Sequence, residues 1–126
     1  MAAQRIAVGR QVLVVEDEML IALIIEETLL DLGVKIVGPV ARLDAASRLA
    51  RESSIDAAIL DVNIRGGNSY AVADILAERQ IPFLFCSGYS DWALDWRHRD
   101  RPHLTKPYSS EDLKNRVLQL LGAPYN

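Results

Sequence analysis

The sequence contains little cysteine and no long apolar run. Its single cysteine, Cys86, cannot form a disulfide within the chain, and this favours a reducing compartment, so we expect a cytoplasmic protein. The longest apolar run, residues 19–25, is far too short to span a bilayer. The first ten residues also lack the apolar segment of a signal peptide. The sequence therefore predicts a protein that does not associate with membranes.

An excess of positive charge is absent as well. The 126 residues include 14 Lys and Arg against 17 Asp and Glu, which gives a formal net charge of −3. A mildly acidic surface is unsuited to neutralising phosphates, so we expect no direct contact with nucleic acid. Half of the residues are hydrophobic, and the length fits one globular domain. We expect a flexible leader over residues 1–9, a folded domain over 10–122 and a short tail over 123–126.

Apolar segments and helical segments alternate five times along the chain. The short apolar segments predict strands, and the longer segments with helical spacing predict helices. Such alternation, with strands that are apolar throughout, is typical of a parallel sheet covered by helices on both faces. The predicted strands are 11–15, 34–37, 57–60, 81–86 and 102–105, and the predicted helices are 19–32, about 43–50, about 70–76, 91–97 and 111–121.

Polar residues follow these strands at the edge where a parallel sheet binds its ligands, beyond the carboxyl ends. They are Glu16, Asp17, Asp61, Ser87 and Lys106. Three carboxylates placed together repel one another and favour a hard cation with oxygen ligands, such as Mg²⁺. A lysine and a hydroxyl complement phosphoryl oxygens, and a carboxylate is itself able to act as the nucleophile. The pattern predicts Mg²⁺-assisted phosphoryl transfer onto an aspartate.

The same residues carry a resemblance to a known family. The motifs VLVVEDE, AAILDVNI, LFCSGYS and LTKPY occur in the order found in the receiver domain of bacterial two-component response regulators. The resemblance extends from about Val12 to Leu121, and PFLFCSGYSD is similar to a subgroup with a Phe-x-x-Ser/Thr-Gly-Tyr segment. It implies a single α/β domain of the flavodoxin-like (βα)5 type, whose five-stranded parallel sheet has the strand order 2-1-3-4-5.

The resemblance assigns roles to the acidic residues. Asp61 would accept a phosphoryl group from a sensor histidine kinase or a histidine phosphotransfer protein. Asp17 would bind Mg²⁺ directly, and Glu16 would act mainly through water. Asp61 and the backbone carbonyl of Asn63 would complete the metal site. Asp17 precedes a predicted helix, so a role as its N-cap is the alternative.

The resemblance also implies a switch. Lys106 would pair with a phosphoryl oxygen, a cis peptide bond would join it to Pro107, and Ser87 would move toward the phosphoryl group. His103 stands where the family usually has its switch aromatic. Because burying a charged imidazole is costly, we expect His103 to stay largely exposed. Conformational change would then concentrate in residues 87–101, where the short spacing between Ser87 and Lys106 predicts a short or irregular helix.

Two other functions fit parts of this pattern. A hydrolase of the haloacid-dehalogenase type also uses a strand-end aspartate with Mg²⁺, but it needs a second aspartate where Asn63 stands, and an amide cannot transfer the proton. A docking module independent of phosphorylation would be expected to have a broken site, whereas this one looks intact. A receiver is not a conventional enzyme, because it catalyses only its own phosphotransfer and slow autodephosphorylation.

The apolar run over residues 19–25 is longer than one buried stripe of a helix requires, so some of it should remain exposed. It could pack on a neighbouring helix, contact the helical bundle of a kinase, or form a homodimer. Because only residues 122–126 follow the last predicted helix, we expect a stand-alone receiver that acts on a downstream protein not identifiable from the sequence.

Overall fold

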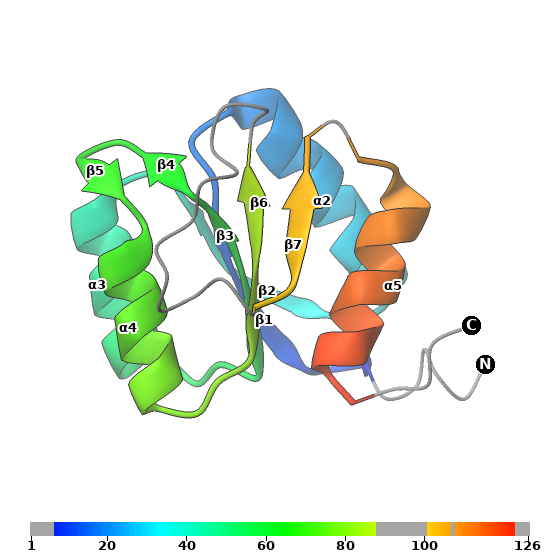
Figure 1. Ribbon diagram of the computed structural model, residues 1–126. Coiled ribbons are helices and arrows are strands. Elements are labelled where there is room, and N and C mark those ends of the chain that lie inside the picture. Colours follow the sequence, from blue (N-terminus) through cyan, green and yellow to red (C-terminus); the bar gives the residue numbers. More distant parts are fainter. Residues whose placement is uncertain (1–6, 88–100, 107, 123–126) are drawn as a thin grey trace.

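A five-stranded parallel sheet forms the centre of the computed structural model, which describes residues 7–87, 101–106 and 108–122, with only the backbone of Ser87 (Figure 1). The order of the strands across the sheet is β2-β1-β3-β6-β7, so the predicted order of 2-1-3-4-5 is confirmed. The strands are β1 (Gln11–Val15), β2 (Lys35–Val40), β3 (Ala57–Asp61), β6 (Phe83–Ser87) and β7 (His103–Thr105).

Helices cover both faces of the sheet, as the sequence predicts. Figure 1 shows α3 and α4 on one face and α2 and α5 on the other. The described helices are α2 (Met19–Asp31), α3 (Leu43–Glu52), α4 (Tyr70–Glu78) and α5 (Ser110–Leu120). None of these helices is long and apolar enough to cross a membrane. The predicted helix over 91–97 lies outside the described residues.

The strands are buried on both faces because their side chains alternate between two cores. In β1, Val12 and Val14 belong to the core beneath α2 and α5, and Leu13 and Val15 belong to the core beneath α3 and α4. All four are fully buried. Burial on both sides explains why these strands are apolar throughout rather than alternately polar. Polar side chains are consequently confined to the strand ends, where the candidate site lies.

Helix termini agree with the sequence in part. Ser109 caps α5, and its Oγ accepts a hydrogen bond from the N–H of Asp112 at 3.0 Å. The N-cap residue of α2 is Glu18 rather than Asp17, so Asp17 does not have the capping role considered for it. Of the predicted leader, the structure describes residues 7–9, in which Ala7 is buried in the core beneath α2 and α5.

Two segments contain more strand than the sequence predicts. The edge strand β2 continues through Gly38 and Pro39 to Val40, because the pairing with β1 shifts register between Leu13 and Val15. An edge strand tolerates proline, which lacks an N–H, better than a central strand does. The predicted end of this strand at residue 37 was therefore wrong.

The segment between the predicted strand 57–60 and the predicted helix 70–76 contains a small hairpin formed by β4 (Asn63–Ile64) and β5 (Gly67–Asn68). Gly66 permits the tight turn between them with a φ of +98°, which is strained for other residues. The backbone of the turn residue Arg65 is hydrogen-bonded to the segment at the start of α3. Its N–H donates to the carbonyl of Ala41, and its carbonyl accepts from the N–H of Leu43. The hairpin that follows β3 is thus attached to the start of α3.

We expect Gly38→Ala to destabilise the protein by about 1–3 kcal/mol more than Gly9→Ala. Both glycines have positive φ, so the conformational cost of alanine is similar. At Gly38, however, the new Cβ would lie 2.9 Å from the carbonyl oxygen of Val14, whereas nothing lies within 4 Å of it at Gly9. Urea denaturation followed by circular dichroism measures both. Equal losses of stability would contradict the close packing at Gly38.

Candidate functional site

Three of the predicted site residues meet at the carboxyl edge of the sheet. Glu16 follows β1, Asp61 is the last residue of β3, and Lys106 follows β7. β1 and β3 are direct neighbours, which places Glu16 beside Asp61. Glu16 and Asp61 are only 3% and 4% exposed. Two carboxylates buried side by side require a compensating cation.

The Lys106 ammonium supplies positive charge at this place. Its Nζ lies 3.0 Å from Glu16 Oε1, 3.0 Å from Glu18 Oε1 and 3.2 Å from Asp61 Oδ2. It donates hydrogen bonds to Glu16 Oε2, Glu18 Oε1 and Asp61 Oδ2. The Lys106 side chain is only 11% exposed, so solvent weakly screens its ion pairs with the buried Glu16 and Asp61. Lys106 therefore connects three carboxylates, from two strand ends and the start of α2.

Glu18 is a member of this cluster that the sequence interpretation missed. Its side chain is 62% exposed and reaches Lys106 across 88 residues of sequence. Its N–H donates to Glu16 Oε2 at 3.1 Å, which helps to orient the buried carboxylate. The only sequence feature that points to Glu18 is its position as the third acid of the segment VVEDE, directly after Glu16 and Asp17.

The other predicted residues lie around this cluster. Asp17 is partly exposed and outside the group of Glu16, Glu18 and Asp61, whose carboxylate oxygens lie within 4.8 Å of one another. Asn63 begins β4, two residues after Asp61. Ser87 ends β6, the strand next to β3, and its side chain and Pro107 lie outside the described residues. Their predicted roles stay predictions.

His103 differs from the expectation of a largely exposed side chain. It is partly buried in β7, where it pairs with Phe85 of β6. Burial disfavours the charged imidazolium and lowers the pKa of His103. Partial burial at the edge of the sheet therefore favours the neutral form of the imidazole.

Burial and crowding change the acidity of the cluster. Burial, with a hydrogen bond and repulsion from Glu16, raises the pKa of Asp61 to about 8, although Lys106 opposes this rise. For Lys106, burial alone would lower the pKa, but the hydrogen bonds to Glu18 and Glu16 and the charge of Asp61 raise it above its usual value. The ammonium thus remains charged. Asp61 needs a further cation to ionise readily near neutral pH.

The residues present fit a divalent cation such as Mg²⁺. Glu16 Oε1 is buried and makes no hydrogen bond, although Lys106 Nζ lies 3.0 Å away in an ion pair. A buried carboxylate oxygen of this kind can also coordinate a hard metal ion. Three carboxylates against one ammonium also leave an excess of negative charge. Mg²⁺ prefers oxygen ligands of this kind.

Comparison with known proteins assigns the same family to the fold and to the sequence. The family model described as "Response regulator receiver domain" matches residues 12–118. The transcriptional regulatory protein PdtaR of Mycobacterium tuberculosis is 35% identical over 111 residues, which are 85% of this chain and 54% of the relative. The chain thus spans about half the length of the curated relatives it matches.

Two solved structures are similar over almost their whole length. SdrG from Sphingomonas melonis Fr1 has a TM-score of 0.79 and 44% identity, covering 98% of this chain and 100% of that chain. The receiver domain of the sensor histidine kinase PA1611 from Pseudomonas aeruginosa PAO1 has a TM-score of 0.74 and 25% identity, covering 91% and 99%. That second structure contains a magnesium ion coordinated in its active-site cleft.

In metal-free protein, we expect Asp61 to make stability fall as the pH rises. Its raised pKa means that the folded state holds a proton that the unfolded state releases near pH 4. The stabilisation is therefore complete below pH 4 and is lost up to about pH 8. The free energy of unfolding of Asp61→Asn relative to that of the wild type should therefore increase by at least about 1 kcal/mol as the pH rises from 5 to 8.

Urea denaturation in a chelating buffer at several pH values measures this difference. Asp31→Asn, at an exposed acid of α2, is the matched control and should show no such trend. A stability difference between Asp61→Asn and the wild type that does not change with pH would contradict the raised pKa.

Proposed function

The chain belongs to the response regulator receiver domain family of two-component signalling, and we propose that it accepts a phosphoryl group on Asp61 in an Mg²⁺-dependent reaction. The donor is a phosphohistidine on a sensor histidine kinase or a histidine phosphotransfer protein. The observation that carries the proposal is the contact of Lys106 Nζ with Asp61 Oδ2 and Glu16 at the carboxyl edge of the sheet. It brings the nucleophile, a cation for phosphoryl oxygens and an acid for the metal to one point.

The chain's own residues perform a simple displacement. An ionised Asp61 oxygen attacks phosphorus and forms a P–O bond, while the P–N bond to the histidine breaks and its electron pair stays on the imidazole nitrogen. Lys106 then pairs with an oxygen of the transferred group. In the proposed site Glu16, Asp17, Asp61 and the carbonyl of Asn63 would hold Mg²⁺. When bound, Mg²⁺ would supply positive charge that favours ionised Asp61 and offsets the charge of the phosphoryl oxygens.

Ser87 and His103 are proposed to convey the phosphorylation to the surface. Ser87 ends the strand beside Asp61, which suits a hydroxyl that contacts a phosphoryl oxygen. His103 lies two residues before the end of the neighbouring strand β7. The segment in which we expect the largest change, residues 87–101, lies almost entirely outside the described residues. A change there would present a new surface to a downstream protein.

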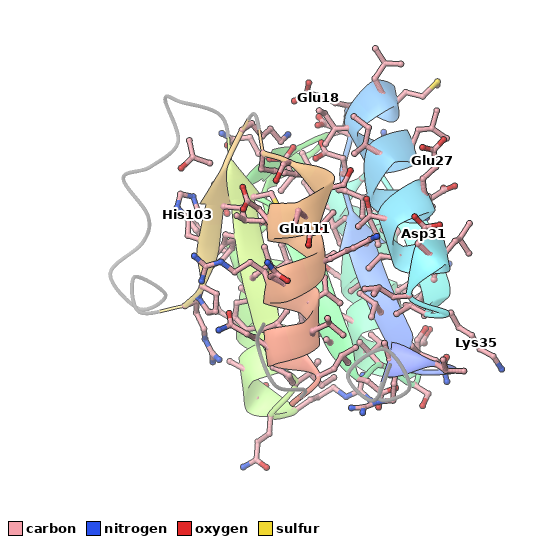
Figure 2. The ribbon with its side chains drawn as sticks, turned by 90° about the vertical axis from the view of Figure 1, so that its right-hand side faces the viewer. Glu18, Glu27, Asp31, Lys35, His103 and Glu111 are labelled. Carbon is pink, nitrogen blue, oxygen red and sulfur yellow. The ribbon has the colours of Figure 1, made fainter. Side chains whose placement is uncertain are left out.

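We place the docking of the phosphodonor on an apolar face of α2. This face, called the α2 apolar face, consists of Met19, Leu20, Leu23 and Ile24, which are between 42% and 86% exposed. Ala22, Ile25 and Leu29 point instead to the core, so burial against the sheet accounts for only part of the run. The face starts directly after Glu18, at the end of α2 next to the site (Figure 2). A helical bundle resting there would hold its phosphohistidine near Asp61.

The alternatives gain less support. Asn63 lies two residues after Asp61, where a hydrolase of the haloacid-dehalogenase type needs an acid. A docking module independent of phosphorylation has no use for two buried carboxylates around an ammonium. A homodimer through α2 would bring together two copies of its acidic side chains, including Glu27 and Asp31 (Figure 2). Receivers work beside the cytoplasmic parts of their kinases, so we propose a cytoplasmic location.

We expect wild-type protein incubated with acetyl phosphate and Mg²⁺ to gain the mass of one phosphoryl group. Asp61→Asn should gain none, because an amide oxygen does not act as the nucleophile. Asp31→Asn, which removes an exposed acid from α2, should be labelled like the wild type. Intact-mass spectrometry followed by peptide mapping gives the answer. Undiminished labelling of Asp61→Asn at another residue would contradict the assignment of the phosphoacceptor.

We expect Leu23→Ser to slow phosphotransfer from a sensor histidine kinase of the same organism by about tenfold, which is typical for a central apolar contact of an interface. Leu30→Ser is the matched control, because Leu30 is also exposed on α2 but lies near the other end of the helix. Both variants should be labelled normally by acetyl phosphate, which needs no docking surface. If the kinase phosphorylates Leu23→Ser as fast as Leu30→Ser, the donor docks elsewhere.

A further inference from the structure

All the hydrogen-bond donors of Lys106 are engaged. The ammonium has three N–H groups, and it donates one hydrogen bond each to Glu16, Glu18 and Asp61. A phosphoryl oxygen that arrives at Asp61 can therefore pair with Lys106 only if one of these three contacts is given up. One of the three carboxylates must therefore lose its hydrogen bond from Lys106.

The three carboxylates differ greatly in exposure. The side chains of Glu16 and Asp61 are 1% and 5% exposed, whereas that of Glu18 is 62% exposed. A buried carboxylate that loses its partner remains without compensation, and this is costly. An exposed carboxylate that loses its partner is hydrated at once, and so the loss is small. The contact with Glu18 is accordingly the one that is exchanged most easily.

Glu18 also has no competing role at the start of α2. It is the N-cap residue of that helix, but its side chain accepts no capping hydrogen bond and contacts Lys106 instead. Its N–H bonds to Glu16 Oε2, which fixes its backbone beside the site. In Figure 2 Glu18 stands at the end of α2, apart from Glu27 and Asp31 farther along the same helix.

We propose that Glu18 is a positioning residue that competes with the phosphoryl group on Asp61 for the Lys106 ammonium. This inference rests on the function proposed for the site. In the resting protein Glu18 holds one N–H of Lys106 on the solvent side of the two buried carboxylates. On phosphorylation the ammonium exchanges Glu18 for a phosphoryl oxygen, and Glu18 becomes hydrated. Glu18 thereby shifts the equilibrium toward the resting state and sets how strongly the phosphorylated state is favoured.

The test is the affinity for beryllofluoride, a phosphoryl mimic, at a fixed saturating concentration of Mg²⁺. We expect Glu18→Gln to bind beryllofluoride about two- to five-fold more tightly than the wild type, the range of one exposed ion pair. Glu18→Ala, which removes the acceptor entirely, should increase the affinity for beryllofluoride at least as much. Glu27→Gln is the matched control, since it removes the same charge from an exposed position of the same helix, and its affinity should be unchanged.

Two further variants distinguish a direct contact from general repulsion of an anion. Glu18→Asp keeps the charge but shortens the side chain by one methylene group, so it should behave like Glu18→Gln if the contact with Lys106 matters. In a Lys106→Ala background, Glu18→Gln should not tighten beryllofluoride binding, since the group for which Glu18 competes is gone. Without metal, the Lys106 ammonium protons should exchange with water faster in Glu18→Ala than in the wild type, as seen by NMR.

The inference is overturned if Glu18→Gln binds beryllofluoride no more tightly than the wild type, or if Glu18→Asp retains wild-type affinity. It is equally overturned if Glu18→Gln has its full effect without Lys106. These results differ from a failure of the proposed function itself, in which wild-type protein with Mg²⁺ would not bind beryllofluoride at all.

Discussion

The ion pairs of Lys106 with carboxylates from the ends of β1 and β3 are the interaction on which the site depends. Glu16 and Asp61 are buried next to each other, and without a cation their mutual repulsion would oppose folding. Lys106 comes from the far edge of the sheet, after β7, and joins the first, third and last strands of the chain at one point. The same contacts keep Lys106 charged, but they do not fully offset burial and Glu16, which raise the pKa of Asp61, so the resting site favours a second cation.

The fold and the centre of the site could be predicted because both follow from regular rules. Strands buried on two faces must be apolar throughout, as Val12 to Val15 show, and parallel strands align their carboxyl ends on one edge. Any polar residue at or directly after the end of such a strand therefore lies at that edge, independently of the conformation of the loops. This is why Glu16, Asp61 and Lys106 were found from sequence, although 90 residues separate the first from the last.

Other features could not be predicted, because they depend on contacts between distant segments. Glu18 looks like an ordinary exposed acid at a helix start, and only the position of Lys106 gives it a partner. The extension of β2 through Pro39 needs the register shift of its neighbour β1. His103 was expected to stay largely exposed on account of its charge, but the pairing of β7 with β6 partly buries it, and this burial lowers the pKa of its imidazole. Local propensity contains none of this information.

The hairpin after β3 has a consequence for the entropy of metal binding. Asn63 begins this hairpin, whose turn is attached to the start of α3 through the backbone of Arg65, and the N–H of Ser69 bonds back to the carbonyl of Val62. A chain segment held in this way loses its conformational freedom when the protein folds. The backbone carbonyl proposed as a metal ligand at Asn63 is therefore in an ordered segment before any ion arrives. Binding there requires little further ordering of the chain, so less conformational entropy is lost when the ion binds.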